Sequence, residues 1–280
     1  MADIDQIAIL QLGPGDARAG LALSTEAHWN QNEADWNFFL AKGIVFGVRD
    51  TAGHLVATRL VATAALLPYT SEDAWISMVL VTENWRRRGL ATRLVDACLD
   101  TATKLGLTTW LDATPAGAAV YGPLGFTPTI QLRRLRLGNA PTSTAVAPLR
   151  SGQPTEFIAC DISAMGFDRR DLLRELEGRA GSRLVSNGDA MALVRDGRIA
   201  RHIGPLFADG PAHALAMVRD IAASETGPLL IDAVANQDAF LKGLTEMGWT
   251  IERPFQRMRF GRATTQPAEL PFAVAGPEYG

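Results

Sequence analysis

The residues best suited to chemistry form a basic turn, Arg86-Arg87-Arg88-Gly89-Leu90-Ala91. The turn follows a continuously apolar run at 75–81 and precedes a run with apolar residues at helical spacing. A helix start presents free backbone N–H groups and the positive end of the helix dipole, and a glycine lets a ligand approach the backbone closely. The arginines add positive charge. The turn is therefore predicted to bind a pyrophosphate-like anion, with a solvated basic first turn as the alternative.

The elements that must position this turn alternate between strands and helices. A strand is predicted at 7–12, and one or two helices are predicted in the polar stretch that holds His28, Trp29, Asp35 and Trp36. A hairpin of two apolar runs is predicted around a turn at 50–53. After the strand at 75–81, the helix is indicated by Leu90, Leu94, Ala97, Cys98 and Ala102 and ended by Gly106. A strand at 108–113, a short helix at 115–122 and a strand at 129–137 complete a mixed α/β domain.

The remainder of the chain repeats this order in part. Residues 138–154 are rich in Pro, Gly, Ser and Thr, so we interpret 1–140 as one domain, 141–154 as a linker and 155–280 as a second domain. Two short matches support an internal duplication. Asp112 in LDA and Asp232 in IDA are 120 residues apart, and the Gly-aromatic pairs at Gly125 and Gly248 are 123 apart.

Composition limits the possible functions. The 280 residues are 47% hydrophobic and 20% charged, which predicts a globular chain that can bury substantial cores. A net charge of −3 offers no general attraction to nucleic acid or anionic membranes, and we expect neither as a partner. Cys98 and Cys160 form no disulfide or metal pattern, so no metal is predicted and a reducing cytoplasm fits. The acidic beginning and the absence of a long apolar run disfavour secretion and membrane spanning.

Two motifs together resemble a known family. Arg-x-x-Gly-x-Ala after an apolar strand, followed by Tyr121-Gly122-Pro123-Leu124-Gly125-Phe126, is similar to the signatures of the GCN5-related N-acetyltransferase (GNAT) superfamily, over about residues 5–137. The tandem arrangement resembles bacterial proteins with an active N-terminal GNAT domain and a degenerate C-terminal one. This resemblance implies an α/β (α+β) fold of two tandem domains, each a mixed, mostly antiparallel sheet flanked by helices.

The resemblance also implies roles for individual residues. Acetyl-CoA would be the co-substrate, with its pyrophosphate on the turn and its pantetheine arm along the preceding strand. Tyr121 would be the general acid that returns a proton to the CoA thiolate. Thr114 stands where the family usually has an Asn that contacts the cofactor. The predicted cofactor-binding residues are Met78, Val79, Leu80, Val81, Arg86, Arg87, Arg88, Gly89, Leu90, Ala91 and Thr92.

The amine acceptor would lie beside the segment 26–36, which forms the wall of the acceptor pocket in the family. Trp29 and Trp36 are the predicted substrate-binding residues, and His28 is the candidate base because its side chain titrates nearest neutrality. A surface or packing role for His28 is the alternative. Ser77 is a poor base, and Glu83 is explained by charge pairing beside the arginines. Asp112 has a counterpart in Asp232, which favours a structural role.

The second half lacks the groups that this chemistry needs. At the position of the basic turn it has Asp209, which repels phosphate, and Pro211, which has no N–H to donate. Leu244 stands at the position of the general acid. We therefore expect the second domain to be catalytically silent, to pack against the first domain and to help shape the acceptor pocket.

Three functional hypotheses follow. The leading one is transfer of the acetyl group from acetyl-CoA to a primary amine of a small molecule in a direct ternary complex, by a monomer or homodimer. Acetylation of a protein or peptide amine is the first alternative. The second is a non-catalytic acyl-CoA-binding sensor, against which the retention of Tyr121 argues. No residue pattern identifies the amine.

Overall fold

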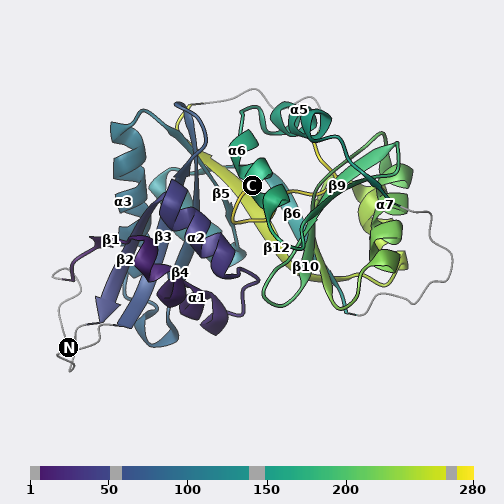
Figure 1. The fold of residues 1–280 in the computed structure, drawn as a ribbon. Helices are drawn as coiled ribbons and strands as arrows, with labels where there is room; N and C mark the ends of the chain where they lie inside the picture. Colours follow the sequence, from purple (N-terminus) through teal and green to yellow (C-terminus); the bar gives the residue numbers. More distant parts are fainter. Residues whose placement is uncertain (1–6, 51–58, 139–148, 263–269) are drawn as a thin grey trace. The chain divides into compact units, whose positions relative to one another are not determined.

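The computed structural model describes residues 7–50, 59–138, 149–262 and 270–280. The chain forms two compact units (Figure 1). Unit 1 comprises Met1–Leu111, Val120–Phe126 and Arg259–Arg262, and unit 2 comprises Asp112–Ala119, Thr127–Met258 and Ala263–Gly280. Each unit therefore combines segments that are distant in the sequence. The division of the chain into 1–140, 141–154 and 155–280 stays a prediction.

Unit 1 contains a mixed, mostly antiparallel sheet. Its strands in spatial order are β1 Leu10–Gln11, β2 Ile44–Asp50, β3 Arg59–Pro68, β4 Asp73–Val81 and β5 Thr108–Ala113. Neighbouring strands pair antiparallel except β4 and β5, which run parallel. β3 and β4 bury almost all of their side chains, which explains why their sequences are continuously apolar instead of alternating.

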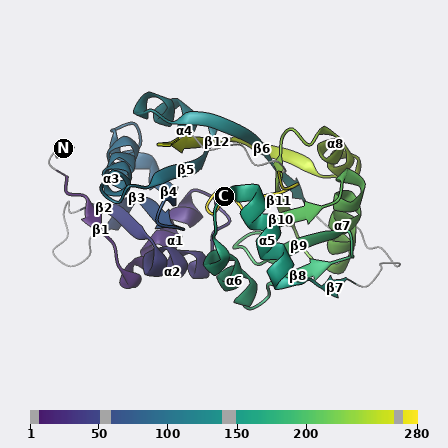
Figure 2. The ribbon, with the colours of Figure 1, turned by 90° about the horizontal axis from the view of Figure 1, so that it is seen from above.

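Helices cover both faces of these strands. Figure 2 shows α3 (Leu90–Lys104) on one face and α1 (Ala17–Glu26) and α2 (Glu33–Lys42) on the other. The predicted apolar stripe of α3 is confirmed, since Leu90, Leu94, Cys98 and Ala102 are buried. α2 begins with a capping box, in which Asn32 Oδ1 accepts from the Asp35 amide and Asp35 Oδ2 accepts from the Asn32 amide. The short α4 (Pro115–Tyr121) follows β5.

Unit 2 is built on the same plan. Its strands in spatial order are β12 Thr250–Phe260, β6 Thr127–Leu137, β11 Leu229–Val234, β10 Arg201–Ala208, β9 Ala190–Arg195, β8 Arg183–Ser186 and β7 Arg150–Ser151. β10 and β11 run parallel, and β6 pairs antiparallel with β11. Its helices are α5 Pro154–Met165, α6 Arg170–Gly178, α7 Pro211–Ser224 and α8 Asp238–Glu246.

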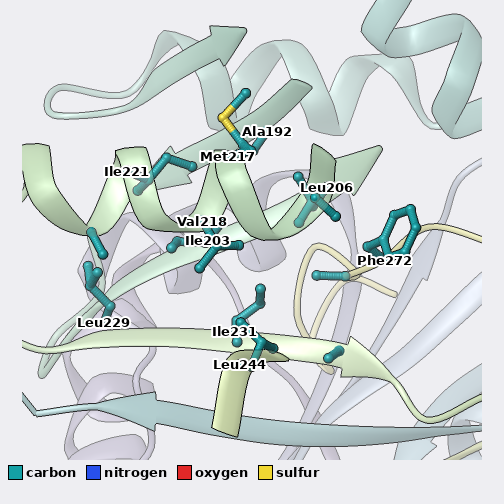
Figure 3. Close-up of a cluster of buried hydrophobic side chains, with 14 of the residues drawn as sticks. Ala192, Ile203, Leu206, Met217, Val218, Ile221, Leu229, Ile231, Leu244 and Phe272 are labelled. Carbon is teal, nitrogen blue, oxygen red and sulfur yellow. The ribbon is translucent and has the colours of Figure 1, made fainter. Parts of the chain in front are cut away.

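The core of unit 2 lies between α7, α8 and the sheet. Figure 3 shows Val218 of α7 beside Ile203 of β10 and Met217 of α7 beside Ala192 of β9, all in one buried cluster. Leu244 of α8 is fully buried in the same cluster. Phe272, from the segment 270–280, packs edge-on against Phe240 with ring centroids 5.2 Å apart. That segment is thus part of this core.

Two buried ion pairs join the halves of the chain reciprocally. Asp112 at the end of β5 receives two hydrogen bonds of 2.9 Å from Arg257 on β12. Asp232 on β11 receives two of 2.8 Å from Arg134 on β6. The aspartates are the matching residues 120 apart, so each pairs with an arginine of the opposite half. This exchange supports the internal duplication and agrees with a structural role for Asp112.

Several elements differ from the sequence-based expectations. The first strand pairs only at Leu10–Gln11, because it lies at the sheet edge and is largely exposed. Helix α5 and strand β12 were not predicted. Most of the predicted turn at 50–53 and most of the linker lie outside the described residues. Within the described residues, no helix is both long and apolar enough to cross a membrane.

Candidate active site

The candidate site begins where β4 and β5 stop pairing. In the described residues the two strands pair in parallel at three positions: Asp73 with Thr108, Ala74 with Thr109, and Trp75 with Trp110. β4 itself continues beyond this pairing to Val81. We call Ile76–Val81 the free edge of β4. Backbone N–H and C=O groups on such an edge can bind an extended ligand as an additional strand would.

A bulge redirects the free edge of β4. The register with β3 shifts between Thr63 and Ala65, and Met78 adopts a left-handed conformation with φ 54°. The Thr63 hydroxyl donates to the Met78 carbonyl oxygen at 2.8 Å, which satisfies one polar group inside the buried strand pair. Met78 to Val81, the residues predicted to contact the pantetheine arm, all follow this bulge or form part of it.

The basic turn follows the free edge after one short 3-10 helix, Glu83–Trp85, and lies where α3 begins. Arg87 and Gly89 both have left-handed backbones, with φ 60° and 79°. The first backbone bond of α3 runs from the Arg93 amide to the Gly89 carbonyl, so the amides of Leu90, Ala91 and Thr92 precede it. A β-carbon added at Gly89 would meet no atom within 4 Å, so the turn is open on that side. This arrangement matches an anion site at a helix N-terminus.

The loop itself holds two of the three arginines. Arg86 Nε donates to the Val81 carbonyl at 3.0 Å, which links the turn to the end of β4. Arg88 donates to the Asn84 carbonyl at 2.7 Å and stacks 5.1 Å from the Trp85 ring centroid. Arg87 is exposed. Hydrogen bonds to loop carbonyls therefore hold the guanidinium groups of Arg86 and Arg88 in place in this positively charged turn.

Tyr121 lies at the end of α4 and is 8% exposed. Its ring centroid is 6.0 Å from that of Phe126. Burial, with a contribution from the Cys98 thiol on α3, raises the pKa of Tyr121 to about 12. The phenol therefore keeps its proton across the neutral pH range. At the other end of α4, the Thr114 hydroxyl accepts from the Gly117 amide at 3.2 Å, so Thr114 caps the helix.

Comparison with known proteins agrees with this geometry. Residues 20–126 match the model of the acetyltransferase (GNAT) family, and residues 157–273 match the model of an acetyltransferase (GNAT) domain. The chain belongs to the GNAT acetyltransferase family. The uncharacterized N-acetyltransferase YitH of Bacillus subtilis (strain 168) is 25% identical over 240 residues, which cover 82% of this chain and 83% of YitH.

Solved structures share the fold over most or all of this chain. A putative acetyltransferase from Pyrococcus horikoshii matches with a TM-score of 0.80 at 19% identity, over 100% of this chain and 98% of the other. A tandem GNAT protein from the clavulanic acid biosynthesis pathway matches with a TM-score of 0.62 at 16% identity, over 92% of this chain and 100% of the other. At these identities the likeness is one of fold.

The candidate acceptor residues of the first GNAT domain differ in their placement. His28 is exposed just after α1, with φ 56°, and Trp29 is half-buried. Trp36 is fully buried, and its Nε1 donates to the Ser24 hydroxyl at 2.9 Å. A β-carbon at Gly20 would come within 2.4 Å of the Trp36 ring, so Trp36 of α2 packs tightly against α1. This position favours packing over contact with a substrate.

Glu26 is a residue that sequence reasoning did not single out. Its carboxylate, at the end of α1, accepts from the Thr82 hydroxyl, from the Glu83 amide at 3.0 Å and from Arg59 at 2.8 Å. The bonds from Thr82 and Glu83 lower the pKa of Glu26, with a further contribution from Arg59 and Arg86. Glu26 thus joins the helix before His28 to the loop that carries the basic turn. No local pattern marks it, because its partners lie 33 to 57 residues away.

The second GNAT domain has a filled gap where the first has the free edge. β10 and β11 pair in parallel from the pair Arg201 and Leu229 to the pair Ile203 and Ile231. Beyond this pairing, Ala273 forms a bridge to Leu206 on one side and to Ala233 on the other. The turn after β10 leads into a helix that begins with Pro211, and Leu244 is buried in the core. The second domain therefore combines an occupied gap with the missing anion-binding and acid groups.

Proposed function

We propose that the protein transfers the acetyl group of acetyl-CoA to a primary amine of a small molecule, within one ternary complex. A single observation carries this proposal: the free edge of β4 is followed, after one short 3-10 helix, by an open, arginine-rich helix start. An extended arm with amide groups and a pyrophosphate at its end has the chemistry that this edge and turn would bind together.

The residues present fit such a co-substrate. The backbone amides from Arg87 to Thr92 would hold the pyrophosphate, and Met78 to Val81 would pair with the pantetheine arm. The second domain supports the second part of this assignment. There residues 272–274 occupy the corresponding gap and form main-chain hydrogen bonds to the strands on both sides.

The proposed chemistry requires two proton movements. The neutral amine attacks the thioester carbonyl carbon, a carbon–nitrogen bond forms and the carbon–sulfur bond breaks. Tyr121 donates its phenolic proton to the departing thiolate. The attacking amine must lose its own proton, and His28 is our candidate to accept it, directly or through water. The exposure of His28 agrees with exchange of that proton with solvent.

The test of the proposal compares two glycines at the ends of α3. Gly89 and Gly106 both have left-handed backbones and open space where a β-carbon would lie, so Gly89→Val and Gly106→Val introduce similar strain. We expect Gly89→Val to weaken acetyl-CoA binding at least tenfold, which is about 1.4 kcal/mol, and Gly106→Val to leave it unchanged. Titration calorimetry measures both. Equal affinities for the two variants would refute the cofactor assignment.

A second measurement addresses the acceptor. Thiol release from acetyl-CoA is followed across amino acids, polyamines, amino sugars and aryl amines, with a peptide carrying a free amine in parallel. Turnover with one class of small amine supports the proposal. Turnover confined to the peptide identifies a protein acetyltransferase, and tight cofactor binding without turnover on any amine identifies a sensor.

A further inference from the structure

Residues 272–274 of the segment 270–280 are bound in unit 2 between two strands, and residues 276–280 form a turn. On one side the Leu206 amide donates to the Ala273 carbonyl and the Phe272 amide donates to the Leu206 carbonyl, each at 2.9 Å. On the other side the Val234 amide donates to the Phe272 carbonyl at 3.1 Å, and the Val274 amide donates to the Asp232 carbonyl at 3.0 Å. Both neighbouring strands are therefore joined through this segment.

Buried arginines hold the rest of the segment. Arg195, 2% exposed, donates to the Ala275 carbonyl at 2.8 Å and to the Glu278 carboxylate at 2.6 Å. Arg169, 3% exposed, donates to the carbonyl oxygens of residues 279 and 280 at 2.7 and 2.6 Å. Asp161 fixes the Arg169 guanidinium through two bonds of 2.8 and 2.7 Å. These cations recognise main-chain oxygens and one acidic side chain.

The gap is shaped for this occupant. Ala273 is fully buried between β10 and β11, so a larger side chain at this position would press on buried neighbours. Gly204 of β10 makes the close approach possible, because a β-carbon there would lie 2.1 Å from the Val274 carbonyl oxygen. The apolar contacts, main-chain bonds and arginine contacts together resemble the capture of a peptide by strand addition.

We propose that the gap between β10 and β11 is a peptide-binding site, and that the segment 270–280 is its ligand in cis. The ligand class is a peptide that pairs with both strands through an aromatic residue, a small residue and an apolar residue at positions 272–274, and then turns to present a carboxylate at 278. The binding is non-covalent and separable from the chain connection. This site is independent of acetyl transfer by the first domain.

The experiment uses the full chain with a specific protease site introduced between residues 263 and 269. After cleavage, we expect the fragment that contains 270–280 to remain with the protein during gel filtration. A fluorescent synthetic peptide of residues 270–280 should exchange with it, followed by fluorescence anisotropy. An Ala273→Leu peptide should bind about tenfold to hundredfold more weakly because it overpacks the gap. A Pro277→Ala peptide is the matched control, since Pro277 is partly exposed, and should bind like the parent.

Two results would overturn the proposal. In the first, the fragment dissociates and the remaining protein keeps its circular dichroism and melting temperature, which would show that the segment is not a specific ligand. In the second, loss of the fragment unfolds the protein and added peptide does not restore it, which would show that the segment is an inseparable part of the core. The proposal is supported if the labelled peptide exchanges with the cleaved fragment and the Ala273→Leu peptide binds more weakly than the Pro277→Ala peptide. Acetyl-CoA binding by the first domain is measured separately.

Discussion

Tyr121 shows what one hydroxyl group is expected to contribute. We predict that Tyr121→Phe keeps acetyl-CoA affinity nearly intact, because the ring still packs against Phe126, while kcat and kcat/KM both fall. General acid catalysis contributes about a hundredfold to ten-thousandfold, and partial replacement by water favours a loss near the lower end. Stopped-flow kinetics with a good amine measures the chemical step. A wild-type rate in the variant would make Tyr121 a packing residue.

The pKa of Tyr121 adds a prediction about pH. A pKa raised to about 12 means that the active, protonated phenol is present below that pH and is lost only as the pH rises through it. We therefore expect kcat of the wild-type protein to show no decline due to Tyr121 between about pH 8 and about pH 10, where an unshifted phenol would begin to ionise. A decline in this range that Tyr121→Phe abolishes would contradict the burial argument.

At the scale of elements, Glu26 connects α1 to the loop before the basic turn. Glu26→Gln keeps the size of the side chain but removes the charge that Arg59 and the Glu83 amide bind. We expect acetyl-CoA affinity to fall about fivefold, equivalent to about 1 kcal/mol, because the turn is held less firmly. Glu33→Gln is the control, since the ion pair of Glu33 with Arg18 is exposed. Equal affinities of the two variants would show that Glu26 does not position the turn.

At the scale of the whole molecule, the exchanged ion pairs connect the two halves of the chain. Asp112→Asn removes the carboxylate charge that compensates the buried Arg257 guanidinium, so it should lower the free energy of unfolding by about 3–5 kcal/mol. The double variant Asp112→Leu/Arg257→Met should lose less, because no unpaired charge remains. Urea unfolding measures each. Glu72→Gln, which removes an exposed pair with Arg262, should change stability by less than about 0.5 kcal/mol.

The tandem arrangement also predicts the number of cofactor sites. We expect one acetyl-CoA per chain, because the second domain has an occupied gap and a helix start with Pro211 in place of a free donor. Calorimetry should give a stoichiometry of one, and Gly89→Val should weaken that single site. A stoichiometry of two would overturn this expectation.

Sequence alone was sufficient for the family, the mixed α/β class and the strand–turn–helix that carries the basic turn. These features depend on local spacing, since Arg86 to Ala91 follow an apolar strand and precede a helical stripe. The same locality made Tyr121 recognisable from its own six-residue motif. The roles of these residues remain proposals that the experiments above address.

Tertiary structure decided the features that depend on partners distant in the chain. From the sequence, Trp36 is a candidate aromatic residue of the acceptor pocket. Only its contacts with Gly20 and Ser24 in the folded chain place its side chain in the interior. Three such features join residues that are tens to more than a hundred positions apart. They are the bonds of Glu26, the exchange of Arg134 and Arg257 between the two aspartates, and the insertion of the segment 270–280 between β10 and β11. Residue spacing encodes which face of an element is apolar, but not which distant element will cover it, and for that reason these contacts became visible only in the folded chain.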